Sequence, residues 1–189
     1  MIILAAGVLL FVLLHGVAAV PRYKSYVKLR TGERWYGLVF GLASVLAIAV
    51  IVLGWRSSGF VAVYEPPAWG WYVNYVLTLI GFLCLGIFLF RGSYRQRLRF
   101  PMGIATALWA VGHLFANGDL ASLILFGGLL LGSVAHMAVA MANGIRPTPE
   151  VRTGHNGLSL IFGAALYGIM TQLHPAIIGV PIFAISKAG

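Results

Sequence analysis

Charged side chains are scarce in this sequence. Asp, Glu, Lys and Arg together make up 9% of its 189 residues, whereas soluble globular chains carry roughly 25%. Hydrophobic residues account for 60%, and the mean hydropathy is +0.94. So few charges cannot cover the surface of a water-soluble fold, which indicates an integral membrane protein.

Acidic residues and cysteine are rarer still. The four acidic residues, Glu33, Glu65, Asp119 and Glu150, fall in predicted loops or at helix ends, which argues against paired-carboxylate catalysis and against a carboxylate proton relay through the membrane. Cys84 has no second cysteine for a disulfide or a thiolate metal site, and we expect it to serve in packing. The motifs of soluble enzymes, such as a Walker loop, a dinucleotide fingerprint or HExxH, do not occur.

Six apolar segments predict the fold. Their ranges are residues 1–20, 36–55, 71–90, 102–115, 120–142 and 157–180. Most reach the roughly 20 residues that a spanning helix needs, and the fourth is short. Such uniformly apolar segments are too long for barrel strands, so we predict an all-α, polytopic transmembrane bundle of about six helices. Because no polar stretch is long enough to link two domains, we expect residues 1–189 to form a single integral membrane domain.

The basic residues are sorted by loop. They follow the first, third and fifth apolar segments, at Arg22, Lys24, Lys28, Arg30, Arg34, Arg91, Arg95, Arg97, Arg99, Arg146 and Arg152, and only Arg56 and Lys187 lie on the other side. The positive-inside rule therefore predicts cytoplasmic basic loops and periplasmic termini in a bacterial inner (cytoplasmic) membrane. It also predicts a retained first helix, since basic residues follow that segment and none precedes it. The net charge of +9 then indicates contact with anionic membrane lipids and no nucleic acid.

Two connections on the other side of the membrane carry turn signals. Residues 56–71 place Tyr64, Trp69 and Trp71 around two prolines, which is typical of an interfacial aromatic belt. Between the fourth and fifth segments, Asn117-Gly118 is expected to end one helix and Asp119 to cap the next. These two helices should form a hairpin.

Three histidines, His15, His113 and His136, lie within predicted spans, where a polar side chain needs a partner. Each lies on a distinctive helix face at three- or four-residue spacing: Phe11, His15 and Ala19; Thr106, Trp109, His113 and Asn117; Gly128, Gly132, His136 and Ala140. The small residues beside His136 would let either a neighbouring helix or a flat ligand approach closely. All three histidines could serve one central pocket.

Two imidazoles on facing helices of a bundle can ligate haem iron. Arg22, Arg30 and Arg99 at the inner boundary could then hold the propionates. The alternative is that each histidine only bonds to a neighbouring helix. Another metal is not expected, since no carboxylate or thiolate cluster accompanies the histidines. The other two histidines are expected at helix termini, with His155 in a capping or surface role and His174, before a proline, in a helix-end role.

Several stretches of the chain, in order, resemble the NnrU family of bacterial membrane proteins. They are "LLHGVAAVPR", "GERWYGLVFGLASVLAIAVIVLGW", "EPPAW", "LWAVGHLFANGDLASLILFGGLLLG" and "LHPAIIGVP". The most specific runs from Leu108 to Gly132, where a histidine, Asn-Gly-Asp and an apolar helix occur together. The resemblance implies a link to denitrification, in which family members support nitrite and nitric oxide reduction.

The family is also similar to the plant 15-cis-zeta-carotene isomerase, a membrane enzyme that uses haem b with histidine ligation. That similarity implies that His15 and His113 are haem ligands, and that His136 matches a further histidine on the next helix. This chain has Arg99-Phe100-Pro101 where relatives often have Arg-His-Pro, which weakens a direct transfer of isomerase activity.

Two functions follow as hypotheses. The first is a haem-b membrane protein with a redox or isomerase function, acting on a nitrogen oxide or an apolar small molecule. The second is a non-catalytic scaffold or accessory subunit, whose helix faces pack against protein partners in a larger respiratory or photosynthetic complex. A transporter is a weaker possibility, because no inverted repeat with paired helix breaks is present.

Overall fold

The computed structural model describes residues 1–146, 150–180 and 182, and within them the regular secondary structure is helical apart from one isolated β-bridge. The helices are α1 (Ile2–Ala19), α2 (Pro21–Thr31), α3 (Glu33–Arg56), α4 (Gly70–Leu89), α5 (Ser93–Leu98), α6 (Pro101–Ala116), α7 (Leu120–Ser122), the π-helix η1 (Leu123–Gly127), α8 (Gly128–Ala142) and α9 (His155–Ile178). The predicted all-α fold is confirmed.

Five helical segments are long and apolar enough to cross a membrane. They are α1, α3, α4, the continuous run Leu120–Ala142 and α9. The sixth predicted span, α6, is apolar but has only 16 residues, as its short sequence segment suggested. The protein is therefore a membrane protein whose apolar helices contact lipid.

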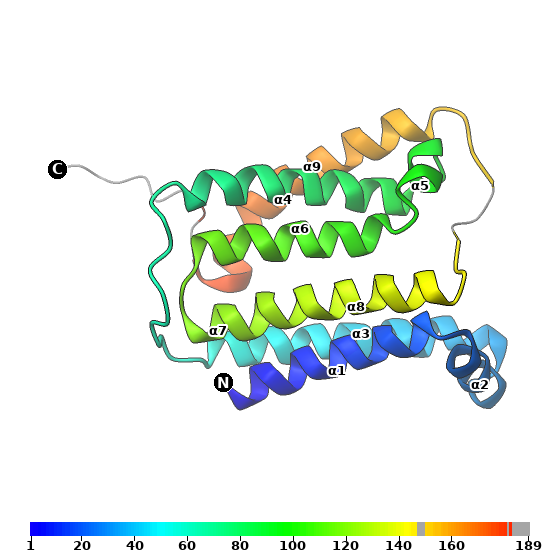
Figure 1. The fold of residues 1–189 in the computed structure, drawn as a ribbon, viewed down its shortest axis with the longest axis horizontal. Coiled ribbons are helices and arrows are strands. Elements are labelled where there is room, and N and C mark those ends of the chain that lie inside the picture. Colours follow the sequence, from blue (N-terminus) through cyan, green and yellow to red (C-terminus); the bar gives the residue numbers. More distant parts are fainter. Residues whose placement is uncertain (147–149, 181, 183–189) are drawn as a thin grey trace.

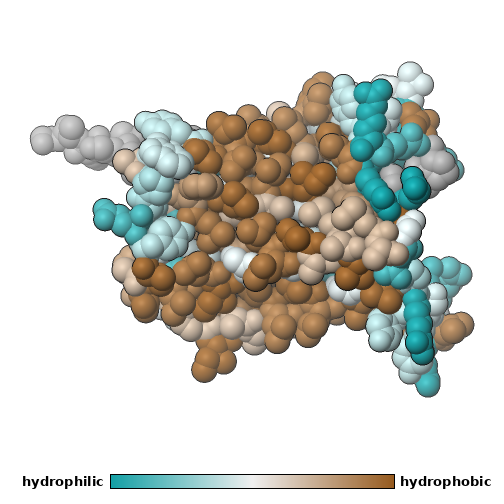
Figure 2. Space-filling view, in the orientation of Figure 1, coloured by the Kyte–Doolittle hydropathy of each residue, from teal (hydrophilic) through white to brown (hydrophobic). Residues whose placement is uncertain are grey.

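The helices lie side by side along one direction (Figure 1). Helix α1 packs on α3, α4 packs on both α6 and α9, and α8 contacts both α1 and α6. Helices α2 and α5 lie at the end of the bundle opposite the N-terminus (Figure 1). In Figure 2 an apolar belt covers the middle of the molecule, and hydrophilic atoms gather at the ends, most densely at the end with α2 and α5. We call that end the basic end, and the opposite one the outer end, after the side of the membrane that the sequence predicts for it.

Small residues let neighbouring helices approach closely. A Cβ atom built on Gly54 of α3 would lie 2.5 Å from the backbone nitrogen of Leu4 in α1. On α8, a Cβ on Gly132 would lie 2.5 Å from a methyl group of Val12, and one on Gly128 would lie 2.6 Å from Val8. The small-residue face of α8 is therefore filled by helix α1, which resolves the choice between a neighbouring helix and a flat ligand at these two glycines.

Two short polar helices in the basic loops were not predicted from the sequence. Helix α2 begins with Pro21 at its first turn, where a missing N–H does no harm, and none of its residues is buried. Its end is joined to α3 by an ion pair of 2.8 Å between Lys28 and Glu33. Hydropathy does not reveal such helices, because they lie along the bundle's basic end without crossing it.

The outer turn before α7 is built as the sequence predicts. Asp119 precedes α7 and accepts a hydrogen bond of 3.0 Å from the backbone N–H of Ser122, and its other carboxylate oxygen accepts one of 2.5 Å from the Ser122 hydroxyl. The long loop before α4 pairs with this turn, since Gly118 O accepts from the N–H groups of Val63 and Tyr64 at 2.8 and 3.0 Å. The two connections thus form one layer over the outer end.

Two smaller predictions have definite outcomes. Cys84 is buried on α4, with 7% of its surface exposed, and is a free thiol, as expected for a packing residue. A helix-end role was expected for His174, because Pro175 follows it. Helix α9 continues through Pro175 to Ile178 and ends at Gly179, which has a left-handed conformation with φ of 87°.

Candidate functional site

His15 lies near the basic end of α1 and is held by its own helix. Its Nδ1 atom lies 2.9 Å from the backbone oxygen of Phe11, one turn earlier. The Phe11 ring stacks on the imidazole at 4.1 Å between ring centroids, and Phe40 of α3 meets it edge-on at 5.2 Å. Two aromatic rings from two helices therefore fix the ring plane.

His113 repeats this arrangement on α6. Its Nδ1 atom lies 2.8 Å from the backbone oxygen of Trp109. Phe126 from η1 stacks on the imidazole at 4.4 Å, and Trp109 lies 4.9 Å from it. The π-helical turn η1 positions Phe126, which is 4% exposed and belongs to the apolar core. The polar and aromatic face predicted for this helix thus points into the bundle.

His136 differs because it bonds to another helix. Its Nδ1 atom lies 3.0 Å from the backbone oxygen of His15, so α8 is tied to α1 at the level of the first histidine. This contact continues the row of close approaches in which Val8 meets Gly128 and Val12 meets Gly132.

The partners of these rings fix which nitrogen carries the proton. A carbonyl oxygen can only accept, so Nδ1 must be the N–H donor in each of the three imidazoles. In a neutral ring Nε2 then holds a free lone pair. Within the described part of the chain, no hydrogen bond involves Nε2 of His15, His113 or His136, and no buried side-chain nitrogen or oxygen lacks a partner. Each Nε2 atom is therefore at least partly uncovered by protein atoms, either in a cavity or on the outside of the bundle.

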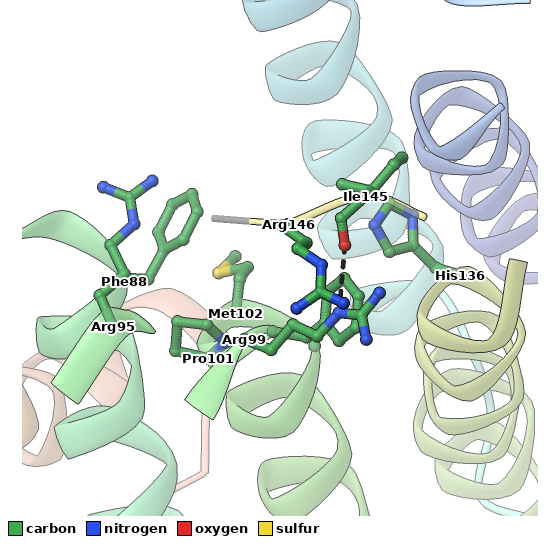
Figure 3. A pocket seen from close by; sticks show the side chains of 10 residues that line it. Phe88, Arg95, Arg99, Pro101, Met102, His136, Ile145 and Arg146 are labelled. Atoms are coloured by element: carbon green, nitrogen blue, oxygen red, sulfur yellow. Dashed lines mark hydrogen bonds between the residues drawn. The ribbon is translucent and has the colours of Figure 1, made fainter. Parts of the chain in front are cut away.

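A cavity of about 150 Å³ lies at the basic end between α6 and α8 (Figure 3). Its lining includes His136 but neither His15 nor His113: Phe88, Arg95, Arg99, Phe100, Pro101, Met102, Gly103, His136, Ile145 and Arg146. Arg99 donates a hydrogen bond of 3.1 Å from Nε to the backbone oxygen of Ile145. The structure therefore brings His136 and Arg99 together, as well as His136 and His15.

The other predicted residues are further apart. Arg22 is exposed on α2, three residues beyond the end of α1, and Arg30 stacks over Tyr26 on the same helix, 5.5 Å from its ring centroid. No hydrogen bond or ring contact joins His113 to His15 or His136 in the described residues. A single pocket lined by all three histidines stays a prediction.

The sequence reasoning singled out Arg99 but treated Arg95 and Arg146 only as loop charges. Both line the same cavity. Arg95 and Arg99 are four residues apart, a spacing that places two residues on one face of a helix. That spacing could have indicated that Arg95 lies beside Arg99. Nothing in the sequence indicated that Arg146, after α8, would join them.

The remaining histidines occupy helix termini. His155 begins α9, and its Nδ1 atom accepts a hydrogen bond of 3.2 Å from the backbone N–H of Arg91. His174 lies in the last turns of α9, and its Nδ1 atom donates to the backbone oxygen of Val180 at 2.7 Å. His174 thus has the predicted helix-end role, whereas His155 does not cap α9, because the N-cap of that helix is Gly154 and no side-chain hydrogen bond closes its first turn.

The donor chemistry of His15 and of His113, each taken separately, suits haem iron, while His15 lies near the basic end of α1 and His113 lies in the last turn of α6 at the opposite end of the bundle. Histidine ligands of metals usually donate one ring N–H to a carbonyl or carboxylate, which orients the ring and makes the other nitrogen a better ligand. Both residues have this arrangement, with Phe11 O and Trp109 O as acceptors. The described residues contain no group of three or more His, Cys, Asp or Glu side chains that could hold a metal ion alone.

The family model described as NnrU protein matches residues 3–182, nearly the whole chain. No curated protein and no solved structure matches this sequence significantly.

Proposed function

The chain belongs to the NnrU family, and from this premise we propose that it is an integral membrane protein that binds haem b, with His15 and His113 as the candidate iron ligands. The observation that carries the proposal is that the two imidazoles make the same kind of hydrogen bond. Each is oriented by an Nδ1 hydrogen bond to the carbonyl four residues earlier, and each leaves Nε2 without a hydrogen-bond partner in the described residues. Such pre-oriented nitrogen ligands suit a haem iron.

The side chains around the two histidines would stabilise this coordination. The stacked rings of Phe11 and Phe126 restrict rotation of the two imidazoles. His136, which donates to the carbonyl of His15, would hold the turn of α1 that carries the first ligand. Because the surroundings are aromatic and aliphatic, they would also keep water away from the ligand nitrogens.

The arginines have different positions relative to such a cofactor. Arg22 follows the helix of His15 and is exposed, so its guanidinium is free to reach a propionate at the basic end. Arg99 is turned into the cavity beside His136. We therefore assign the propionate contact to Arg22 first, with Arg99 as the second candidate.

A bound haem would supply one-electron chemistry. Two reaction classes are compatible with the family resemblance: reduction or handling of a nitrogen oxide, and redox-dependent isomerisation of an apolar carotenoid. The apolar belt allows an apolar substrate to enter from the bilayer. The departure at Phe100, where relatives often carry histidine, favours the nitrogen-oxide class over direct carotenoid isomerisation.

The test is the absorption spectrum of the full-length protein, purified in mild detergent, before and after reduction with dithionite. We expect a Soret band that shifts on reduction, and we expect it to be lost or strongly reduced in His15→Ala and in His113→Ala. His155→Ala is the matched control, because that histidine lies at the start of α9 and accepts only from the N–H of Arg91, outside the proposed site. It should keep the full haem content.

A flat spectrum from folded wild-type protein would overturn the proposal. Co-purification of such colourless protein with a stoichiometric membrane partner would then support the scaffold function. Equal haem content in the wild type and both ligand variants would show that the cofactor is held elsewhere.

A further inference from the structure

The cavity at the basic end gathers positive charge from three segments. Arg95 comes from α5, Arg99 from the turn before α6, and Arg146 from the segment after α8. In Figure 3 the guanidinium groups of Arg99 and Arg146 lie close together, and Arg95 extends beside Phe88, 5.2 Å above its ring. Like charges in one cavity repel each other, so an anion between them would be strongly favoured.

The chain has no carboxylate side chain left to neutralise this cavity. Of its four acidic residues, Glu33 pairs with Lys28 at 2.8 Å and Glu150 pairs with Arg91 at 2.6 Å. Glu65 and Asp119 belong to the connections at the outer end. The neutralising anion must therefore come from another molecule.

Arg99 is fixed in an unusual conformation that points it into the cavity. Its φ of 57° makes it the one residue other than glycine with positive φ in the described chain. Such a conformation is costly for a side-chain-bearing residue and is typical of functional sites. The bond from Nε to Ile145 O uses one donor of the guanidinium, and its two terminal nitrogens are left to bind an oxyanion by paired hydrogen bonds.

The beginning of α6 adds backbone donors to the same place. Pro101, Met102 and Gly103 form its first turn and line the cavity. Proline has no backbone N–H, so the donors here are the N–H groups of Met102 and Gly103. The capping residue Phe100 makes no side-chain hydrogen bond to this turn, and the first N–H groups of a helix have no acceptor within the helix. Helix N-termini attract anions through these groups and the helix dipole, so backbone and side chains favour the same ligand.

Size and surroundings select the kind of anion. Sites for whole drug-sized molecules have volumes of about 300 to 1,000 Å³, whereas this cavity has about 150 Å³, enough for a phosphate group and little more. Phe88, Phe100 and Met102 give it apolar walls, and its arginines come from segments at the basic end of the bundle, where α5 lies (Figure 1). Basic pockets between helices at this depth are suited to anionic lipid head groups.

We propose that the cavity lined by Arg99, Arg146 and the first turn of α6 binds the phosphate of an anionic phospholipid whose acyl chains remain in the bilayer. Arg99 and Arg146 bind the phosphate oxygens, and the α6 N–H groups complete the site. Arg95 covers the mouth from its position on Phe88. The bound lipid would hold α6 and the segment after α8 together, since the two arginines come from those two parts.

Native mass spectrometry of the full-length protein in non-ionic detergent tests this assignment. Dioleoyl phosphatidylglycerol and dioleoyl phosphatidylcholine are titrated separately, so that only the head group differs. We expect at least a tenfold preference for phosphatidylglycerol, and at least a tenfold loss of that affinity in the Arg99→Gln/Arg146→Gln double variant. Lys24→Gln/Arg97→Gln is the matched control, which removes the same charge from the same end outside the cavity. It should change the affinity by less than twofold.

Other outcomes of the lipid-binding experiment would contradict the proposal. The proposal would be overturned if the two lipids bound equally well. It would also be overturned if Lys24→Gln/Arg97→Gln lost as much affinity as Arg99→Gln/Arg146→Gln, because general surface charge would then explain the binding. Competition by inorganic phosphate with an affinity like that of the lipid would identify a site for free phosphate instead. Loss of haem from the Arg99→Gln/Arg146→Gln variant would assign the cavity to propionates. Arg146→Gln alone, at an exposed position, keeps the test valid if the double variant does not fold.

Discussion

The Nδ1 atom of His136 lies 3.0 Å from the backbone oxygen of His15, so one of the three intramembrane histidines holds the helix turn that carries another. This contact separates their roles. His15 and His113 bond to their own helices, whereas His136 joins two helices and also faces the arginine-lined cavity. His136 is therefore better placed as a positioning residue than as a ligand.

His136→Leu should weaken the bundle and leave haem bound. Interhelical side-chain hydrogen bonds in membranes contribute about 0.6 kcal/mol on average and up to about 1.7, so we expect a loss of unfolding free energy of about 1 kcal/mol. SDS-driven unfolding in mixed micelles, followed by circular dichroism, measures it. Ser133→Ala on the same helix is the control, since that hydroxyl donates only to Leu130 O of its own helix. A haem loss as complete as in His15→Ala would instead make His136 a ligand.

Gly54→Ala should separate α1 from α3. The added Cβ would lie 2.5 Å from the backbone nitrogen and 2.6 Å from Cα of Leu4, and backbone cannot move aside as a flexible side chain can. Overpacking of this kind costs about 1 to 3 kcal/mol, which the same unfolding measurement would detect. Gly41→Ala on the same helix meets nothing within 4 Å, so it should cause no loss. Equal effects of the two substitutions would contradict the packing argument.

Much of the fold was predictable because the bilayer restricts the possibilities. An apolar segment must be helical to satisfy its backbone in lipid, so all six predicted segments became helices, with ends within three residues of the prediction. The cap at Asp119 followed from local chemistry in the same way. The short helices α2 and α5 were not predicted, because a polar helix at the end of the bundle produces no apolar segment in the hydropathy.

The site was harder to predict, because it depends on which helices are neighbours. The sequence placed His136 among small residues but did not show whether a helix or a ligand fills the space, and the structure puts Val8 and Val12 of α1 there. Arg146 joins Arg99 in one cavity only because α8 ends beside the start of α6. Helix pairing of this kind is set by packing between distant segments, which a single sequence does not reveal.

Asp119→Ala should loosen the start of the helix that continues through η1 into α8. It removes the acceptor for both the N–H and the hydroxyl of Ser122, a residue with 0% of its surface exposed. Loss of an N-terminal cap costs about 0.5 to 2 kcal/mol, and the SDS unfolding curve should shift accordingly. Asp119→Asn keeps an acceptor oxygen at this position and should retain most of the stability. If Asn is as damaging as Ala, the charge of Asp119 and not its capping bond would be the important property.

Tyr64→Phe should release the outer loop from α6, and its effect should depend on pH. The Tyr64 hydroxyl donates to the backbone oxygens of Leu114 and Asn117, the latter at 2.7 Å. Burial, and then the charge of Asp119, raise the pKa of Tyr64 above its ordinary value of 10.0. The folded state therefore keeps the proton more tightly than the unfolded state, so this contribution is complete below pH of about 10 and is lost as the pH rises through the folded pKa.

The stability difference between the wild type and Tyr64→Phe should accordingly be constant from neutral pH to about pH 10 and shrink above it. Chymotrypsin cleavage within residues 57–69, measured by mass spectrometry of intact protein in detergent, reports release of the loop directly. Tyr72→Phe provides the control, because Tyr72 is 72% exposed and loses no comparable bond. If the difference for Tyr64→Phe stayed constant above pH 10, the hydroxyl would not be donating its proton to the α6 carbonyls.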